Sequence, residues 1–183
     1  VQKNHISDSF ATCAIRLIVK NLPLVLTKPT TEARAELALA STLAGIAFSN
    51  SMVGIVHAIG HACGGEASVP HGNAMTILLP NCMRYNLPAC EAEYGELLLY
   101  LAGADVYANT APQNRANKAI EFVENFEKKL NEICGIPLKL SDYSVTEEIL
   151  PNIAKKAIND GAIIVNKRPA SIDDVMGILH KCM

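Results

Sequence analysis

Residues 54–79, GIVHAIGHACGGEASVPHGNAMTILL, hold three of the five histidines of this chain, at positions 57, 61 and 71. His57 and His61 are four residues apart, so on a helix their side chains project from the same face. His71 follows shortly after a glycine-rich turn. Imidazole nitrogen is a common ligand of zinc, iron, nickel and copper. The spacing therefore makes this stretch a candidate metal centre.

Glycine and proline divide the stretch into two predicted helices. The glycine pair at residues 64–65 predicts the end of the helix that carries His57 and His61. Pro70 predicts the start of the next helix, because proline loses nothing by lacking an N–H in a first helical turn. A helix end, a turn and a new helix start can aim His71 at the face that the first two histidines share.

Two other interpretations of the histidines arise. Zinc proteases also place two histidines four residues apart on a helix, but they need a glutamate directly after the first one as general base. Ala58 occupies that position here, which excludes a protease site of this kind. The remaining alternative is that the three histidines are packed helix residues whose ring nitrogens bond to backbone groups.

The composition is that of a globular domain with a large apolar core. Half of the 183 residues are hydrophobic and 19% are charged, which predicts a single domain. The formal net charge of −2 argues against a nucleic-acid partner. Six scattered cysteines without a C-x-x-C pair predict reduced thiols. No secretory segment opens the chain, and the apolar run at residues 37–48 is too short to cross a bilayer. We therefore expect a soluble, cytoplasmic protein.

Helical patterns dominate the chain from end to end. Apolar spacing, capping residues and breaker residues predict helices from Ser7 to Pro23, from Thr30 or Thr31 to Phe48, over residues 54–61, from Pro70 or His71 to about Tyr85, over residues 90–101, over residues 114–133, from Ser144 (with Glu147 in a capping box) to Ala157, and from Ser171 to Cys182. Glu127 is predicted on a solvated helix face. Residues 103–113 predict a loop, and residues 162–165 are a short β-like run. The sequence therefore predicts an all-α bundle of about seven to nine helices.

The order of the motifs resembles the iron-containing (group III) alcohol dehydrogenases. The motifs that carry the resemblance are Asn21-Leu22-Pro23, Ala44-Gly45-x-Ala47-Phe48-x-Asn50, His57-x-x-x-His61-x-x-Gly64-Gly65, Pro70-His71-Gly72, Ile77-Leu78-Leu79-Pro80, Met83-x-x-Asn86, Gly135-Ile136-Pro137 and Pro169-Ala170-Ser171. They cover nearly all of the chain. The resemblance implies the helical, metal-binding C-terminal domain of these enzymes, which has the dehydroquinate synthase-like fold.

The resemblance also implies what accompanies this domain. In the family an N-terminal α/β domain binds NAD(P) through a glycine-rich loop. The helical domain binds the metal through an Asp and a His four residues apart and then through two more histidines, which correspond to His57 and His71. The Asp-His pair would lie upstream of Val1. We therefore expect residues 1–183 to be a single helical domain without its first metal-ligand helix and without the NAD(P)-binding domain.

The resemblance assigns roles to three further residues. It implies that His61 lies near the metal and the nicotinamide without binding the metal, so we expect it to relay a proton or position a reactant. Phe48 and Val53 fall where the family lines its substrate pocket, with plain core packing as the alternative for both. The implied cofactors are NAD(P) and Fe²⁺ or Zn²⁺, since a site of nitrogen and oxygen ligands accepts either ion.

These features predict the metal- and substrate-binding half of an NAD(P)-dependent alcohol dehydrogenase that interconverts alcohols and aldehydes by hydride transfer. The expected partners are a small alcohol or aldehyde and NAD(P), which binds through the other domain. We expect the protein to bind neither nucleic acid nor a membrane. The sequence leaves open whether it forms a homo-oligomer. Two histidines supply half of a usual ligand set, so we expect an incomplete or empty metal site and an inactive isolated chain. The alternative is a stand-alone helical binding module that has lost catalysis.

Overall fold

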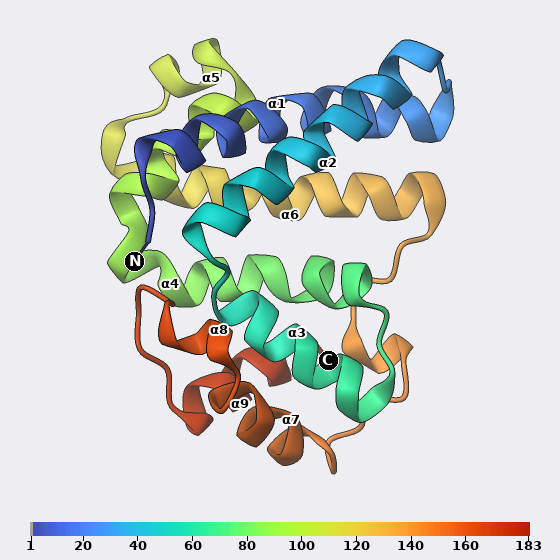
Figure 1. The fold of residues 1–183 in the computed structure, drawn as a ribbon, viewed down its shortest axis with the longest axis vertical. Helices are drawn as coiled ribbons and strands as arrows, with labels where there is room; N and C mark the ends of the chain where they lie inside the picture. Colours follow the sequence, from blue (N-terminus) through green and yellow to red (C-terminus); the bar gives the residue numbers. More distant parts are fainter. Residues whose placement is uncertain (1) are drawn as a thin grey trace. The chain divides into compact units, whose positions relative to one another are not determined.

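A computed structural model describes residues 2–183. Over these residues the structure is built from α-helices with two short 3-10 helices and without strands, which confirms the predicted all-α class (Figure 1). The α-helices are α1 (His5–Thr27), α2 (Thr31–Ser51), α3 (Ile55–Ala67), α4 (His71–Ala102), α5 (Ala104–Asn109), α6 (Arg115–Cys134), α7 (Leu150–Ile158), α8 (Gly161–Ile164) and α9 (Ile172–Lys181). The 3-10 helices are η1 (Pro112–Asn114) and η2 (Leu140–Asp142).

By its internal contacts the chain forms two compact units. The first unit contains the chain up to Met52 together with Glu91–Gly135, and the second contains Val53–Cys90 together with Ile136–Met183. Helices α1, α2, α5 and α6 therefore belong to the first unit, and α3, α7, α8 and α9 belong to the second. Helix α4 is divided between the units at Cys90. The expectation of a single domain stays a prediction.

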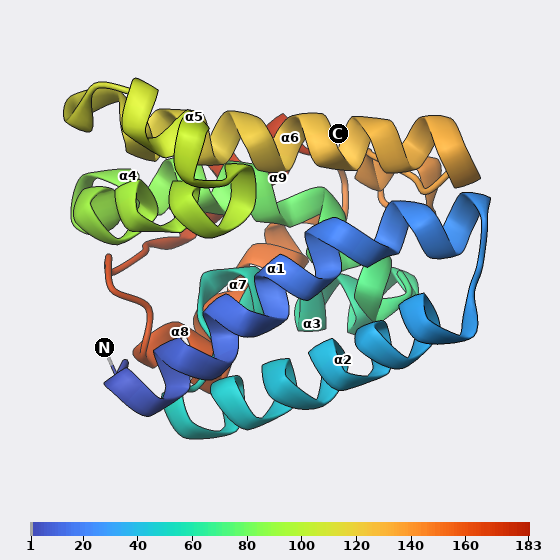
Figure 2. The same ribbon diagram turned by 90° about the horizontal axis from the view of Figure 1, so that it is seen from above.

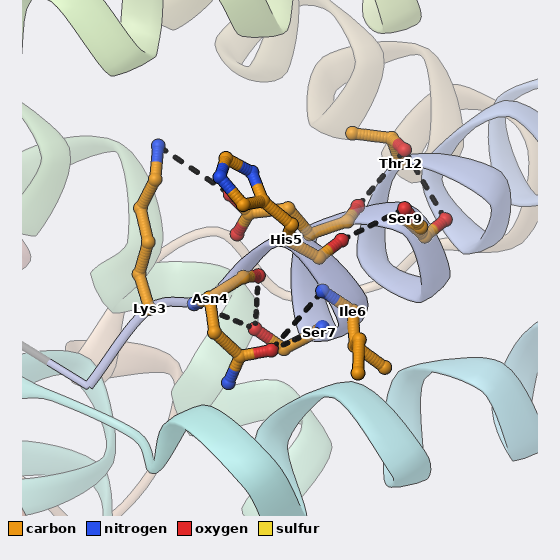
Figure 3. A network of polar contacts seen from close by, with 8 residues as sticks. Lys3, Asn4, His5, Ile6, Ser7, Ser9 and Thr12 are labelled. Atoms are coloured by element: carbon orange, nitrogen blue, oxygen red, sulfur yellow. Dashed lines mark hydrogen bonds and ion pairs between the residues drawn. The ribbon is translucent and has the colours of Figure 1, made fainter.

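Helix α1 begins with a capping box at Asn4, three residues before the predicted cap. The side-chain oxygen of Asn4 accepts hydrogen bonds from the N–H groups of Ile6, at 3.1 Å, and Ser7, at 2.9 Å (Figure 3). In return the Ser7 hydroxyl accepts the Asn4 N–H at 3.2 Å. Ser7 is thus the third helical residue and is buried, so its prediction as the cap is wrong.

Helix α1 also continues past Pro23 to Thr27, so the predicted stop at Pro23 is wrong. Proline removes one helical N–H, but packing of α1 along α2 holds the chain in place (Figure 2). The buried amide of Asn21 donates both to the Leu17 carbonyl, at 2.9 Å, and to Glu36 of α2, at 2.7 Å. Beyond the proline, the Thr27 hydroxyl donates to the Pro23 carbonyl at 2.8 Å.

By length and composition alone, α1 could cross a membrane, and α2 and α3 pass the same test as a pair bent by 105°. The contacts of α1 point to packing within the protein. Helix α1 lies against α2 and α6, and Lys20 forms an ion pair with Glu36 of α2 at 2.9 Å. Charged pairs of this kind are expensive at the centre of a bilayer.

Helix α6 is amphipathic as predicted, apart from Glu127. That side chain is only 9% exposed, so its prediction on the solvated face is wrong. Glu127 follows buried Ile120 by seven residues, which places both side chains on the same stripe of the helix. Gly135 ends α6 in the left-handed conformation, with φ +71°, which glycine adopts without a steric penalty.

The second unit packs α3 against α7 and α8, and α7 against α9 (Figure 1). Its fully buried centre includes Ile59, Leu78, Ile153, Val175 and Leu179. Three buried cysteines, Cys63, Cys82 and Cys182, belong to the same core. Among residues 2–183 no disulfide joins the six cysteines, and burial raises the pKa of the Cys63 thiol to about 12. Burial also raises the pKa of Cys82, so the Cys63 and Cys82 thiols stay protonated and pack as small apolar groups.

Two helix boundaries near the histidines differ from the prediction. Helix α3 runs through the glycines at residues 64–65 and ends at Ala67, and the next residue, Ser68, is left-handed with φ +55°. Helix α4 continues past Tyr85 and Pro88, and its backbone leaves helical geometry only at Cys90. Glycine and proline lower helix stability locally, but tertiary packing overrides that preference.

Two further predictions were wrong in the rest of the chain. The capping box predicted at Ser144 is absent, and α7 begins at Leu150 with Pro151 in its first turn. The loop predicted at residues 103–113 contains α5. The β-like run at residues 162–165, too short to predict a strand, largely forms α8, in agreement with the all-α class. These segments are short, and the apolar pattern of a short run does not distinguish helix from strand or loop.

Candidate metal centre

The structure brings the three predicted histidines together in the second unit. His57 and His61 lie on α3, and His71 is the first residue of α4. The ring centres are 5.8 Å apart for His57 and His61, 5.5 Å for His57 and His71, and 5.6 Å for His61 and His71. The rings therefore form one cluster drawn from two helices.

The turn between α3 and α4 places His71 beside α3. Ser68 donates its N–H to the Gly64 carbonyl at 3.0 Å and takes the left-handed conformation, which reverses the chain. Val69 then buries its side chain to 3% exposure and anchors the turn in the core. Pro70 precedes α4, whose first turn closes with a 3.0 Å hydrogen bond from the Ala74 N–H to the Pro70 carbonyl.

A carboxylate that the sequence did not single out binds one member of the cluster. Nδ1 of His61 lies 2.9 Å from Oδ2 of Asp160, in the turn between α7 and α8. Burial alone would raise the pKa of the Asp160 carboxyl. The Ala162 N–H and the His61 ring together hold that pKa below its ordinary value, so the group stays ionised.

His57 is the least exposed member of the cluster and has a lowered pKa. Burial is the largest cause of the shift, followed by the proximity of the His71 and His61 rings, while Asp160 acts in the opposite direction. A lowered pKa favours the neutral imidazole, which is the form that donates a lone pair to a metal.

The donor set suits a divalent first-row metal but is incomplete as the side chains lie. Imidazoles that share one tetrahedral ion have ring centres roughly 5 Å apart, given metal–nitrogen distances of ~2.0–2.1 Å. The three separations here are slightly longer. Within residues 2–183, no group of three or more His, Cys, Asp or Glu side chains is arranged to hold an ion. His57 and His71 can therefore supply part of a ligand set that needs further donors.

A network centred on Asn166 fixes the start of the helix that carries His57 and His61. Gly54, the residue before α3, offers no capping side chain, and Asn166 Oδ1 accepts the Ile55 N–H at 3.2 Å instead. The approach is so close that a Cβ on Gly54 would lie 2.8 Å from this oxygen. The Asn166 and Asn86 amides also bond to each other in both directions, at 2.8 Å and 3.1 Å. Sequence reasoning missed this role, because the partners are distant in the chain.

The two predicted substrate-pocket residues lie in different units. Phe48 is on α2 in the first unit and is 51% exposed, so core packing does not account for it. Val53 is the first residue of the second unit, is partly buried, and stands in the short connection between α2 and α3. Their assignment to a substrate pocket stays a prediction.

Comparison with known proteins finds relatives of the same fold. The 1,3-propanediol dehydrogenase of Klebsiella pneumoniae is 35% identical over 179 residues, which are 97% of this chain and 45% of that protein. The NAD-dependent methanol dehydrogenase of Bacillus methanolicus is 31% identical, with the same coverage of both chains. The structure of an alcohol dehydrogenase from Oenococcus oeni matches all of this chain and 46% of its own, with a TM-score of 0.91 and 29% identity.

The chain thus spans less than half the length of these relatives. The sequence profile of the "Fe-containing alcohol dehydrogenase family, C-terminal" matches residues 1–183. Structural agreement over the whole chain confirms that its helices have the arrangement found in this family. The chain therefore belongs to the Fe-containing alcohol dehydrogenase family and corresponds to its C-terminal domain.

Proposed function

We propose that this chain is the metal- and substrate-binding half of an iron-containing, NAD(P)-dependent alcohol dehydrogenase. The supporting observation is the cluster of His57, His61 and His71, whose ring centres lie 5.5–5.8 Å apart in a member of this family. His57 and His71 are the proposed ligands of Fe²⁺ or Zn²⁺. The Asp-x-x-x-His pair implied by the family resemblance would complete the ligand set.

His57 and His61 have different proposed tasks. Oxidation of an alcohol removes a hydride from carbon and a proton from oxygen, and a bound divalent metal supplies the Lewis acidity that favours loss of the proton. Burial keeps the pKa of His57 low, so this ring stays neutral and able to donate to the metal. The His61 side chain is 46% exposed and is the proposed relay that passes the proton toward water.

The proposed substrates are small primary alcohols and the corresponding aldehydes. The relatives named for 1,3-propanediol and methanol both act on primary alcohols by name. Phe48 and Val53 are the proposed pocket residues, and NAD(P) binding is assigned to the remainder of a full-length protein. For that reason we propose that the 183-residue chain alone does not turn over alcohols. Cysteines that form no disulfide within the described residues are in keeping with the proposed cytoplasmic location.

The metal assignment is tested by titrating Co²⁺ or Zn²⁺ into the purified chain and following binding by calorimetry or visible absorption. We expect weak binding by the parent chain and none by a His57→Ala, His71→Ala double variant. A His5→Ala, His180→Ala double variant removes the same number of imidazoles outside the cluster and should bind like the parent. Equal loss in both double variants would contradict the assignment, as would unchanged binding without His57 and His71.

A further inference from the structure

The Asp160 carboxylate is held at both of its oxygens. Its Oδ2 lies 2.9 Å from Nδ1 of His61, and its Oδ1 accepts the Ala162 N–H at 2.7 Å. The second bond is the N-cap of α8, so Asp160 cannot turn away from His61 without uncapping that helix. The carboxylate is therefore a fixed acceptor placed against one nitrogen of one histidine in the cluster.

This arrangement determines which nitrogen of a neutral His61 carries the proton. An ionised carboxylate can only accept hydrogen bonds, and a neutral imidazole has one N–H and one lone pair. A 2.9 Å contact between Nδ1 and Oδ2 consequently requires the hydrogen on Nδ1. The lone pair is then left on Nε2.

We propose that Asp160 is a positioning residue that fixes neutral His61 in the Nδ1–H tautomer and holds the orientation of its ring. A histidine whose one nitrogen donates to a carboxylate presents its other nitrogen as a better base or ligand. In the reaction, which rests on the proposed function above, Nε2 of His61 takes the alcohol proton while Nδ1–H stays bonded to Asp160. The Asp160 charge then balances the imidazolium that forms.

A neighbouring ion pair shows that Asp160 is not needed merely to join the two helices. Lys156 of α7 pairs with Glu66 of α3, about one helical turn from the contact between His61 and Asp160. This pair links the same two helices without touching the His61 ring nitrogens. It therefore supplies a matched control, because its removal disturbs the packing of α3 on α7 and leaves the acceptor of His61 intact.

The tautomer can be measured on the metal-free 183-residue chain by long-range ¹H–¹⁵N correlation of the histidine rings at pH 8.5, where free imidazole is neutral. A His61→Gln variant assigns the resonances. We expect the parent and Lys156→Met to show a protonated Nδ1 and an unprotonated Nε2. Asp160→Asn should reverse this pattern, because its Oδ1 still caps α8 while its NH₂ group donates to Nδ1. Asp160→Ala should lose the fixed tautomer and show averaged shifts.

The outcomes separate this inference from the proposed function. A parent chain with the proton on Nε2 of His61 would overturn it, as would an Asp160→Asn chain that keeps the parent pattern. A Lys156→Met chain that changes the tautomer as much as Asp160→Asn would also contradict it, since helix packing would then be the cause. None of these measurements involves metal or NAD(P). A failed metal titration therefore leaves the tautomer result standing, and a failed tautomer measurement leaves the metal assignment standing.

Discussion

Glu127 is a buried carboxyl group on α6 whose surroundings disfavour its charge. Burial, with a smaller contribution from Glu124, raises its pKa to about 8, against 4.5 for the free side chain. Between these two values the folded chain keeps a proton that the unfolded chain has lost. The free energy of unfolding therefore falls as the pH rises from about 4.5 to about 8, by at most ~1.4 kcal/mol per pH unit from this group.

Glu127→Gln should remove this dependence on pH. The amide is neutral at every pH, so the variant should be more stable than the parent at pH 8 by roughly 2–4 kcal/mol and should lose most of that advantage at pH 4.5. Urea denaturation at several pH values measures the difference. Glu121→Gln, at an exposed position of the same helix, should show no such trend. If the free energy of unfolding changed with pH in the same way for the parent and for Glu127→Gln, the raised pKa of Glu127 would be contradicted.

At the scale of the secondary-structure element, the local caps of α2 and α9 were predicted correctly, those of α1 and α7 were not, and the long-range cap of α3 was missed. Thr30 and Ser171 cap α2 and α9 as predicted, because each side chain bonds to an N–H three residues later in the same segment. The start of α3 depends instead on Asn166, which is 111 residues away from its partner Ile55. No pattern within residues 54–79 could reveal that partner.

Asn166→Ala should therefore destabilise the fold by about 3 kcal/mol. The change leaves the largely buried Asn86 amide without its partner and removes the acceptor of the Ile55 N–H, and losses of this kind cost roughly 1–3 and 0.5–2 kcal/mol respectively. Chemical denaturation measures the effect. Asn50→Ala removes an exposed amide on α2 and should change stability by less than about 0.5 kcal/mol. If the two variants proved equally stable, the hydrogen bonds of Asn166 would contribute nothing to the stability of the fold.

The same distinction applies to the candidate site. The spacing of His57 and His61, with the turn before His71, predicted that these side chains lie together, and the ring distances agree. Asp160 escaped prediction because it is separated from His61 by 99 residues and has no distinctive local motif. Residues close in sequence can be placed by helical periodicity alone, whereas a partner on another helix requires the packing of α3 on α7.

At the scale of the whole molecule, the chain passes between its two units at three places where the backbone is not helical. The passages follow Met52, Cys90 and Gly135. Cys90 interrupts α4 with φ −130° and ψ 17°, and Gly135 is left-handed. Met52 has φ 65° and ψ 177°, a conformation that is open almost only to glycine. The left-handed passage at Gly135 suits glycine, whereas the passage at Met52 is strained.

Met52→Gly should relieve this strain and stabilise the protein. A non-glycine residue in this conformation costs about 1–3 kcal/mol, while glycine costs ~0.5–1 kcal/mol through the extra freedom of the unfolded chain. Because the Met52 side chain is 51% exposed, its loss removes little buried area, and a net gain of about 1 kcal/mol is expected. Ser49→Gly, at an exposed position in the last turns of α2, tests the same substitution where the backbone is helical and should lose about 0.5–1 kcal/mol. Thermal and urea denaturation of the two variants measure the contrast. A loss of stability in Met52→Gly equal to that in Ser49→Gly would mean that the connection between the units stores no strain.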